Sequence, residues 1–166
     1  MTLTALGWMA TAAYTLHIAE EYALGWRDWV RSITGKFVSN RSFFGFNGLV
    51  VVLGAVGAMT AGSWPCTALL FAAIMLVNAT FFHIGSMIWK RGRFSPGLFT
   101  AVVLFFPIGL WTMKAGLSTS VLTPIRLVGV LCAGLLLHGI PIWILLAKEG
   151  TMATPGGPSR SRVRSS

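Results

Sequence analysis

The chain has 166 residues, of which 55% are hydrophobic and only 10% are charged. This composition excludes an ordinary soluble globular domain and favours a small, single-domain integral membrane protein. The net charge of +9 would favour nucleic-acid binding in a soluble protein. Here the basic residues stand mostly between or after hydrophobic segments, so we expect membrane lipids rather than nucleic acid as the partner.

Five segments are long and apolar enough to cross a bilayer core, which takes about 20 residues of helix. In chain order they are residues 3–25, 43–61, 65–89, 96–114 and 121–147. Turn signals or charges separate them. The sequence therefore predicts an all-α fold, a bundle of five transmembrane helices that forms one domain over residues 1–147. The first segment has no basic residue before it, so we interpret it as a retained helix rather than a signal peptide.

The connections determine the expected orientation. Eleven of the 13 Lys and Arg residues lie in the first connection, the third connection or the tail, and basic residues near helix ends are retained in the cytoplasm. We expect the N-terminus outside and the C-terminus inside, in a bacterial inner membrane. Residues 27–42 mix aromatic, aliphatic and basic side chains, which suits an interfacial segment. Residues 148–166 are rich in Gly, Pro, Ser and Arg, which predicts a disordered basic cytoplasmic tail.

Seven histidine, glutamate and asparagine residues stand inside the apolar segments, where each one needs a partner, water or a function. They are His17, Glu20, Glu21, Asn47, Asn78, His83 and His138. Because neighbouring helices run in opposite directions, the histidines and asparagines fall in a band roughly 6 to 17 Å from the cytoplasmic end, at 1.5 Å per residue. The outer half holds almost no ionisable group, with Arg126 the exception. We therefore expect one polar pocket in the cytoplasmic half.

The first helix contributes a histidine beside two carboxylates. Glu20 and Glu21 follow His17 at i+3 and i+4, so both are its neighbours on the helix surface. They diverge from each other by about 100°, so one can face the bundle axis while the other reaches a neighbouring helix or the interface.

Two chemistries fit this set. Imidazoles and carboxylates are good ligands for zinc, iron or manganese, and helical bundles hold such metals in their cores. A buried carboxyl group beside a histidine is also an acid/base pair that moves protons on an apolar substrate. The residues alone do not decide between them. We favour the metal site slightly, because all three histidines of the chain lie at a similar depth in the bundle.

Structural interpretations exist for each residue taken singly. Glu20 and Glu21 suit the end of a span, paired with Arg27 or Arg31, and buried His or Asn residues often form hydrogen bonds between helices. Ser95 and Pro96 suit an N-cap and a first helical position. Only the convergence of the polar residues favours a functional pocket.

The stretch His17-Ile18-Ala19-Glu20-Glu21 resembles the motif that names the HXXEE family of small bacterial membrane proteins. The sequences "NATFFH" at 78–83 and "RFSPGL" at 93–98 are also similar to the family's pattern, and the resemblance runs from about residue 8 to residue 147. It implies that His17, Glu20 and Glu21 define the family. It supplies neither substrate nor mechanism, because no activity is established for the family.

Our leading hypothesis is a membrane-embedded enzyme whose site opens toward the cytoplasmic leaflet. The expected metal ligands, or proton donors and acceptors, are His17, Glu20, Glu21, His83 and His138. The expected substrate is a lipid or isoprenoid-like molecule, oriented by Asn47 and Asn78. A phosphate or other anionic headgroup would bind Lys90, Arg91 and Arg93. Metal-assisted hydrolysis or oxidation and proton-transfer isomerisation or cyclisation all use such groups.

The alternatives are a carrier or sensor for metal ions or protons, and a structural subunit whose polar residues only fix helix packing. The sparsely polar outer half argues against transport by a monomer, although an oligomer would line a path differently. Haem bound by two histidines is a weaker option, because it needs no adjacent carboxylates.

Overall fold

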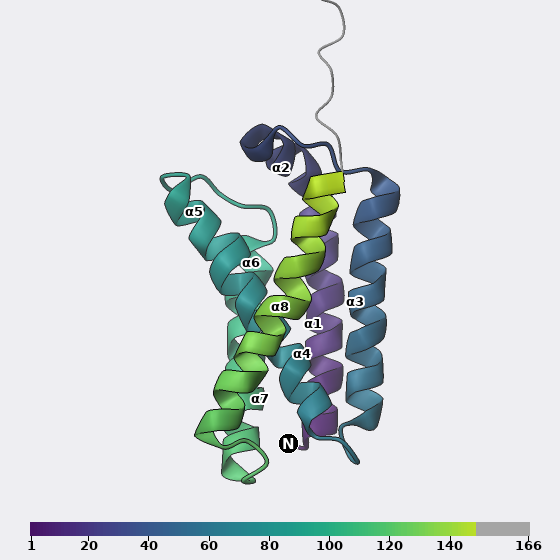
Figure 1. The fold of residues 1–166 in the computed structure, drawn as a ribbon, viewed down its shortest axis with the longest axis vertical. Helices are drawn as coiled ribbons and strands as arrows, with labels where there is room; N and C mark the ends of the chain where they lie inside the picture. Colours follow the sequence, from purple (N-terminus) through teal and green to yellow (C-terminus); the bar gives the residue numbers. More distant parts are fainter. Residues whose placement is uncertain (149–166) are drawn as a thin grey trace, which may run out of the picture.

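The computed structural model describes residues 1–148, and every regular element in that part of the chain is a helix (Figure 1). The predicted all-α fold is confirmed. The elements are α1 (Leu3–Ala23), α2 (Trp26–Thr34), α3 (Asn40–Thr60), α4 (Cys66–Val77), η1 (Asn78–Gly85), α5 (Ser86–Trp89), α6 (Leu98–Thr100), η2 (Ala101–Phe105), α7 (Phe106–Ser118) and α8 (Pro124–Lys148). The predicted tail lies outside the described residues from position 149 onward.

Several short elements join end to end into longer rods. The π-helix η1 connects α4 to α5, and the π-helix η2 connects α6 to α7. Four rods among the described residues are long and apolar enough to cross a membrane: Asn40–Thr60, Cys66–Trp89, Leu98–Ser118 and Pro124–Ala147. They correspond to the second to fifth predicted segments and support a multi-pass membrane protein. Helix α1 is not among the four, so the fifth span and the orientation of the termini stay predictions.

The helix ends follow from local chemistry. The chain leaves α1 through Gly25, whose φ of +71° turns it into α2, so the first helix ends at Ala23 instead of residue 25. The Ser39 hydroxyl accepts a hydrogen bond from the Ser42 N–H at 3.0 Å, which caps α3 and starts it at Asn40, three residues earlier than expected.

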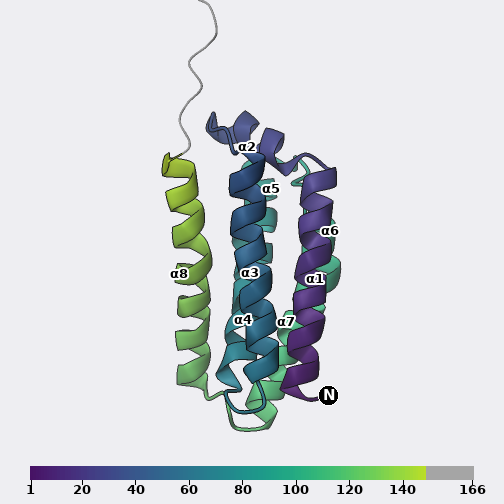
Figure 2. The same cartoon turned by 90° about the vertical axis from the view of Figure 1, so that its right-hand side faces the viewer.

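Helix α2 lies across one end of the bundle (Figures 1 and 2). Its Val30 is buried whereas Asp28 and Arg31 lie on the outer side of the helix. This amphipathic helix begins one residue before the predicted interfacial segment 27–42 and covers its first part. The end of α5 and the C-terminal end of α8 lie at the same end of the bundle, opposite the N-terminus (Figure 1). The basic first and third connections therefore share one end of the molecule.

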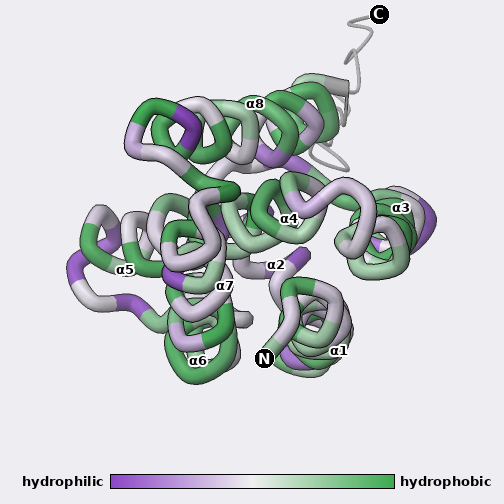
Figure 3. The backbone as a smooth tube through the Cα atoms, turned by 90° about the horizontal axis from the view of Figure 1, so that it is seen from below, coloured by the Kyte–Doolittle hydropathy of each residue, from purple (hydrophilic) through white to green (hydrophobic). Residues whose placement is uncertain are grey.

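Helix α4 occupies the middle of the bundle, with the other long helices around it (Figure 3). The main core cluster packs the aromatic rings of Tyr14, Phe43, Phe71 and Phe105 against Met75 and smaller aliphatic side chains. Helices α1 and α3 pack closely because Gly7 meets Ala58: a Cβ at position 7 would lie 2.9 Å from the Ala58 Cα. The outward faces of α3 and α8 expose large apolar side chains, including Leu49, Val52, Val56, Val128 and Leu136. Apolar surface of this kind suits contact with lipid.

Candidate functional site

Three buried side chains from two rods converge near the α2 end of the bundle. The Nε2 atoms of His17 and His83 each lie 3.5 Å from Glu21 Oε1. One ligand atom from each residue lies within 4.8 Å of the others. Their exposed fractions are 0% for His17, 1% for His83 and 6% for Glu21. We call these three residues the His/Glu cluster.

The spacing within the His/Glu cluster suits a shared ion better than direct hydrogen bonds. A separation of 3.5 Å exceeds the usual N–H···O range, and His17 Nε2 has no hydrogen-bond partner. Ligand atoms about 2.1 Å from a tetrahedral metal ion lie about 3.4 Å from one another. The cluster therefore has the donor types and the spacing of a metal site with two histidines and one carboxylate.

The other ring nitrogen of each histidine is held by a hydroxyl group. His17 Nδ1 lies 2.8 Å from Thr100 Oγ1, and His83 Nδ1 lies 3.1 Å from Ser95 Oγ. The Thr100 hydroxyl donates its proton to the Gly97 carbonyl at 3.2 Å, so it accepts from His17 Nδ1–H. His17 Nε2 then presents its lone pair to Glu21. Hydrogen bonds of this kind orient metal-binding histidines in proteins.

Both hydroxyls come from residues 95–100, the turn before α6 together with α6 itself, and we call this segment the clamp turn. Its Gly97 has a φ of +92° and packs directly on the cluster. A Cβ at position 97 would lie 2.6 Å from His83 Cε1 and 2.7 Å from His17 Cε1. Only glycine suits both the backbone conformation and the space.

Glu20 does not join the cluster and instead binds the clamp turn. Its carboxylate accepts hydrogen bonds from the backbone N–H groups of Gly97 (3.2 Å), Phe99 (3.2 Å) and Thr100 (2.8 Å). These are the free donors at the start of the α6–α7 rod. The N-cap expected from Ser95 is therefore replaced by Glu20 from α1, while the Ser95 hydroxyl binds His83. The rod begins at Leu98 rather than at Pro96, because Gly97 holds the turn.

The π-helix η1 brings Asn78 and His83 to one side of their rod. Residues five apart diverge by about 140° in an α-helix, whereas the i→i+5 bonding of a π-helix aligns them. Both residues are buried and line the same cavity. Short π-helical stretches frequently occur at functional sites.

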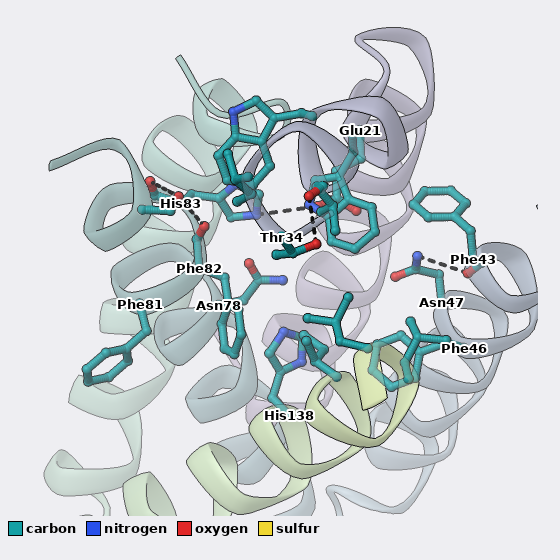
Figure 4. Close-up of a pocket in the computed structure, with 18 of the residues that line it drawn as sticks. Glu21, Thr34, Phe43, Phe46, Asn47, Asn78, Phe81, Phe82, His83 and His138 are labelled. Carbon is teal, nitrogen blue, oxygen red and sulfur yellow. Dashed lines mark hydrogen bonds and ion pairs between the residues drawn. The ribbon is translucent and has the colours of Figure 1, made fainter. Parts of the chain in front are cut away.

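A cavity of about 340 Å³ adjoins the cluster at Glu21 and His83 (Figure 4). Its walls come from α1, α2, α3, the η1–α5 stretch and α8, and most of its lining is aromatic or aliphatic. Two of the lining side chains, Phe81 and Trp89, are 59% and 73% exposed. The cavity therefore reaches the side of the bundle along η1 and α5, where α5 diverges from α8 (Figure 1).

The remaining residues predicted for the site lie elsewhere around it. His138 lines the cavity from α8 but lies outside the His/Glu cluster, with its ring centroid 5.0 Å from that of Phe82. Asn47 also lines the cavity, and its amide is engaged by the Tyr14 hydroxyl at 3.4 Å and by the Phe43 carbonyl at 3.1 Å. Lys90, Arg91 and Arg93 follow α5 and are not among the cavity-lining residues.

Sequence reasoning missed Gly97, Thr100 and Trp29 as parts of the site. Trp29 lines the cavity from α2, and its Nε1 is buried without a hydrogen-bond partner. The only sequence signal for the clamp turn was the Ser-Pro-Gly sequence itself, which is typical of helix starts in general.

The fold and site thus define a helical bundle of membrane type with a buried His/Glu cluster beside an apolar cavity. The chain belongs to the family described as "Protein of unknown function with HXXEE motif", whose model matches residues 8–112. The cluster and the clamp turn lie within that match, and His138 lies beyond it. Neither a curated protein nor a solved structure matches the chain.

Proposed function

We propose that the protein is a membrane-embedded, metal-dependent enzyme that acts on a lipid-like substrate. His17, Glu21 and His83 would hold a zinc, iron or manganese ion at the cytoplasmic side of a bacterial inner membrane. Helix α1 would form a fifth span, because it runs the length of the bundle beside α3 (Figure 2).

One observation carries the metal site. The two Nε2 atoms lie at metal-ligand spacing from one carboxylate oxygen, while hydroxyl groups hold both Nδ1 atoms. A histidine that only packed in a core would satisfy both of its nitrogens, whereas His17 leaves its Nε2 unpaired.

Catalysis is favoured over a purely structural metal because of the adjoining cavity. Structural zinc sites have four protein ligands, whereas catalytic sites use three and keep a position for water or substrate. Here three protein donors are available, and two of them face the cavity. A metal ion held there would polarise a substrate oxygen or activate a water molecule. The apolar walls and the lateral opening suit a substrate that arrives from the lipid.

The test is the metal content of the purified protein, measured by mass spectrometry of the elements. We expect about one equivalent of a transition metal in the wild type and its loss in His17→Ala and Glu21→Gln. The matched control is Glu20→Gln, which changes the neighbouring carboxylate and should keep the metal. A folded wild type that takes up no zinc, iron or manganese would overturn the metal site and favour proton transfer by the same three groups. Retained metal without turnover of any lipid would favour a carrier or sensor.

A further inference from the structure

The cavity contains buried polar atoms that no residue of the described chain satisfies. Both ring nitrogens of His138 and the Oδ1 atom of Asn78 lack a hydrogen-bond partner. The exposed fraction is 2% for His138 and 5% for Asn78, and both side chains are directed into the cavity (Figure 4). Burying a polar group without a partner costs free energy. The arrangement therefore indicates a bound group that satisfies these atoms.

His138 is available for a ligand because neither the metal site nor the packing of the bundle occupies its nitrogens. It lies outside the His/Glu cluster. Its ring contacts are the aromatic rings of Phe82 at 5.0 Å and Phe46 at 6.2 Å, measured between centroids. Those rings hold the imidazole in place and leave its two nitrogens to the cavity.

The unsatisfied atoms specify the chemistry of the group they bind. Asn78 Oδ1 only accepts hydrogen bonds, whereas a neutral imidazole offers one donor and one acceptor. A hydroxyl group both donates and accepts, so one hydroxyl donates to Asn78 Oδ1 and accepts from the N–H of His138. A ketone or an ether has no proton to donate and would leave Asn78 Oδ1 unpaired.

Charge argues against a phosphate or carboxylate headgroup inside the cavity. The lining contains no Lys or Arg. An anion at the level of His138 would therefore be desolvated without a basic side chain of the lining beside it. The basic residues Lys90, Arg91 and Arg93 stand outside the lining, so they do not neutralise a group at the level of His138.

We propose that His138 and Asn78 bind the hydroxyl group of a neutral lipid alcohol whose hydrocarbon body lies along the aromatic wall. The volume of about 340 Å³ falls within the range of small-molecule sites. The inference deepens the proposed function and rests on it for the idea that a lipid-like substrate enters this cavity. It makes His138 a substrate-binding residue rather than a metal ligand, and Asn78 the residue that selects an alcohol over an ether.

The experiment compares three probes that share one hydrocarbon body: an isoprenoid alcohol, its methyl ether and its phosphate monoester. Binding to the full-length protein in detergent is measured by native mass spectrometry. We expect the alcohol to bind at least about tenfold more tightly than the ether, the value for one lost hydrogen bond. The phosphate ester should bind more weakly than the alcohol. Asn78→Leu should remove the preference for the alcohol over the ether, because both probes accept from His138 but only the alcohol donates to Asn78 Oδ1. His138→Phe should weaken the binding of both probes, and His138→Gln should restore part of it.

Two controls keep the test decisive. Thr112→Val removes a buried hydroxyl on α7, outside the cavity lining, and should leave the preference unchanged. His17→Ala removes a proposed metal ligand that does not line the cavity, so it should lose metal and keep the preference. The inference is overturned if folded Asn78→Leu prefers the alcohol as the wild type does, if folded His138→Phe binds both probes as tightly as the wild type does, or if the phosphate ester binds best. Absence of metal in the wild type would instead overturn the proposed metal site and leave alcohol binding standing.

Discussion

At the scale of single residues, the adjacent glutamates Glu20 and Glu21 of the motif have different roles. Glu21 points into the His/Glu cluster, whereas Glu20 accepts three backbone hydrogen bonds from the clamp turn. Glu20→Ala should lower the free energy of unfolding by about 2–4 kcal/mol, because it removes charge-assisted hydrogen bonds and leaves backbone donors unpaired. Equilibrium unfolding in mixed detergent micelles measures the loss. Folded Glu20→Ala molecules should still bind metal; if they bind none, Glu20 belongs to the metal site.

Gly97 gives a second test at this scale, because a methyl group there would strike both imidazoles. We expect Gly97→Ala to lose metal as well as stability. Gly92→Ala is the matched control: Gly92 also has a positive φ, +85°, but no atom lies within 4 Å of its would-be Cβ. Gly92→Ala should lower the free energy of unfolding only by the cost of backbone strain, about 1–2 kcal/mol, and should leave the metal content unchanged. Equal metal content in the two variants would refute the close packing of the clamp turn on the cluster.

The sequence predicts much of the site at this scale, for a physical reason. Depth along a helix depends only on residue count, so His17 and His83 could be placed at one level without knowing how the helices pack. The rotation of a helix about its own axis depends on packing. The sequence therefore could not tell which of Glu20 and Glu21 faces inward. Nor could it show that the Ser95 hydroxyl binds His83 rather than capping its own helix, because both uses suit the same side chain.

At the scale of the element, the π-helix η1 is the feature that positions His83. Deleting the exposed residue Thr80 should return this stretch to α-helical bonding and rotate His83 by about 100° relative to α4. We expect loss of metal with little change in helix content, as measured by elemental analysis and circular dichroism. Thr80→Ala keeps the number of residues in the helix, so it should leave the direction of His83 and the metal content unchanged. Metal retained after the deletion would mean that η1 does not set the direction of His83.

The rod that contains η1 shows why the sequence predicts the ends of a helix more accurately than the side of the helix on which a residue lies. The segment 65–89 was predicted as one helix, and the rod from Cys66 to Trp89 agrees with it to one residue. Its length and apolar character do not depend on the bonding pattern. The face that carries Asn78 does depend on it, and "NATFFH" contains no proline or charge that would reveal a change from i→i+4 to i→i+5 bonding.

At the scale of the whole molecule, the site lies at the end that also holds α2 and the basic connections. That end was predicted to face the cytoplasm from charge alone. The geometry adds a reason for this location. An amphipathic helix that lies across the end of a bundle suits the lipid headgroup layer. Helix α2 also contributes five residues to the cavity wall: Trp26, Trp29, Val30, Ile33 and Thr34.

Native and introduced cysteines test the orientation. Cys66 is exposed at the start of α4, at the end of the bundle away from α2, and Cys132 is exposed within the apolar rod α8. In intact cells a membrane-impermeant maleimide should label Cys66 and leave Cys132 unlabelled, since a reagent that stays in water does not reach a thiol that faces lipid. Cys66→Ala should abolish the signal. On that background, Ser32→Cys on the exposed side of α2 should react only after the membrane is opened.

The same preparation decides whether α1 is a span. If α1 crosses the membrane, a tag placed before Met1 lies on the Cys66 side and protease removes it from intact cells. If α1 lies along the surface or inside, the tag shares the side of Ser32→Cys and survives until the cells are opened. That result would place the motif helix at the interface. The buried His/Glu cluster would then have to be reached from water instead of from lipid.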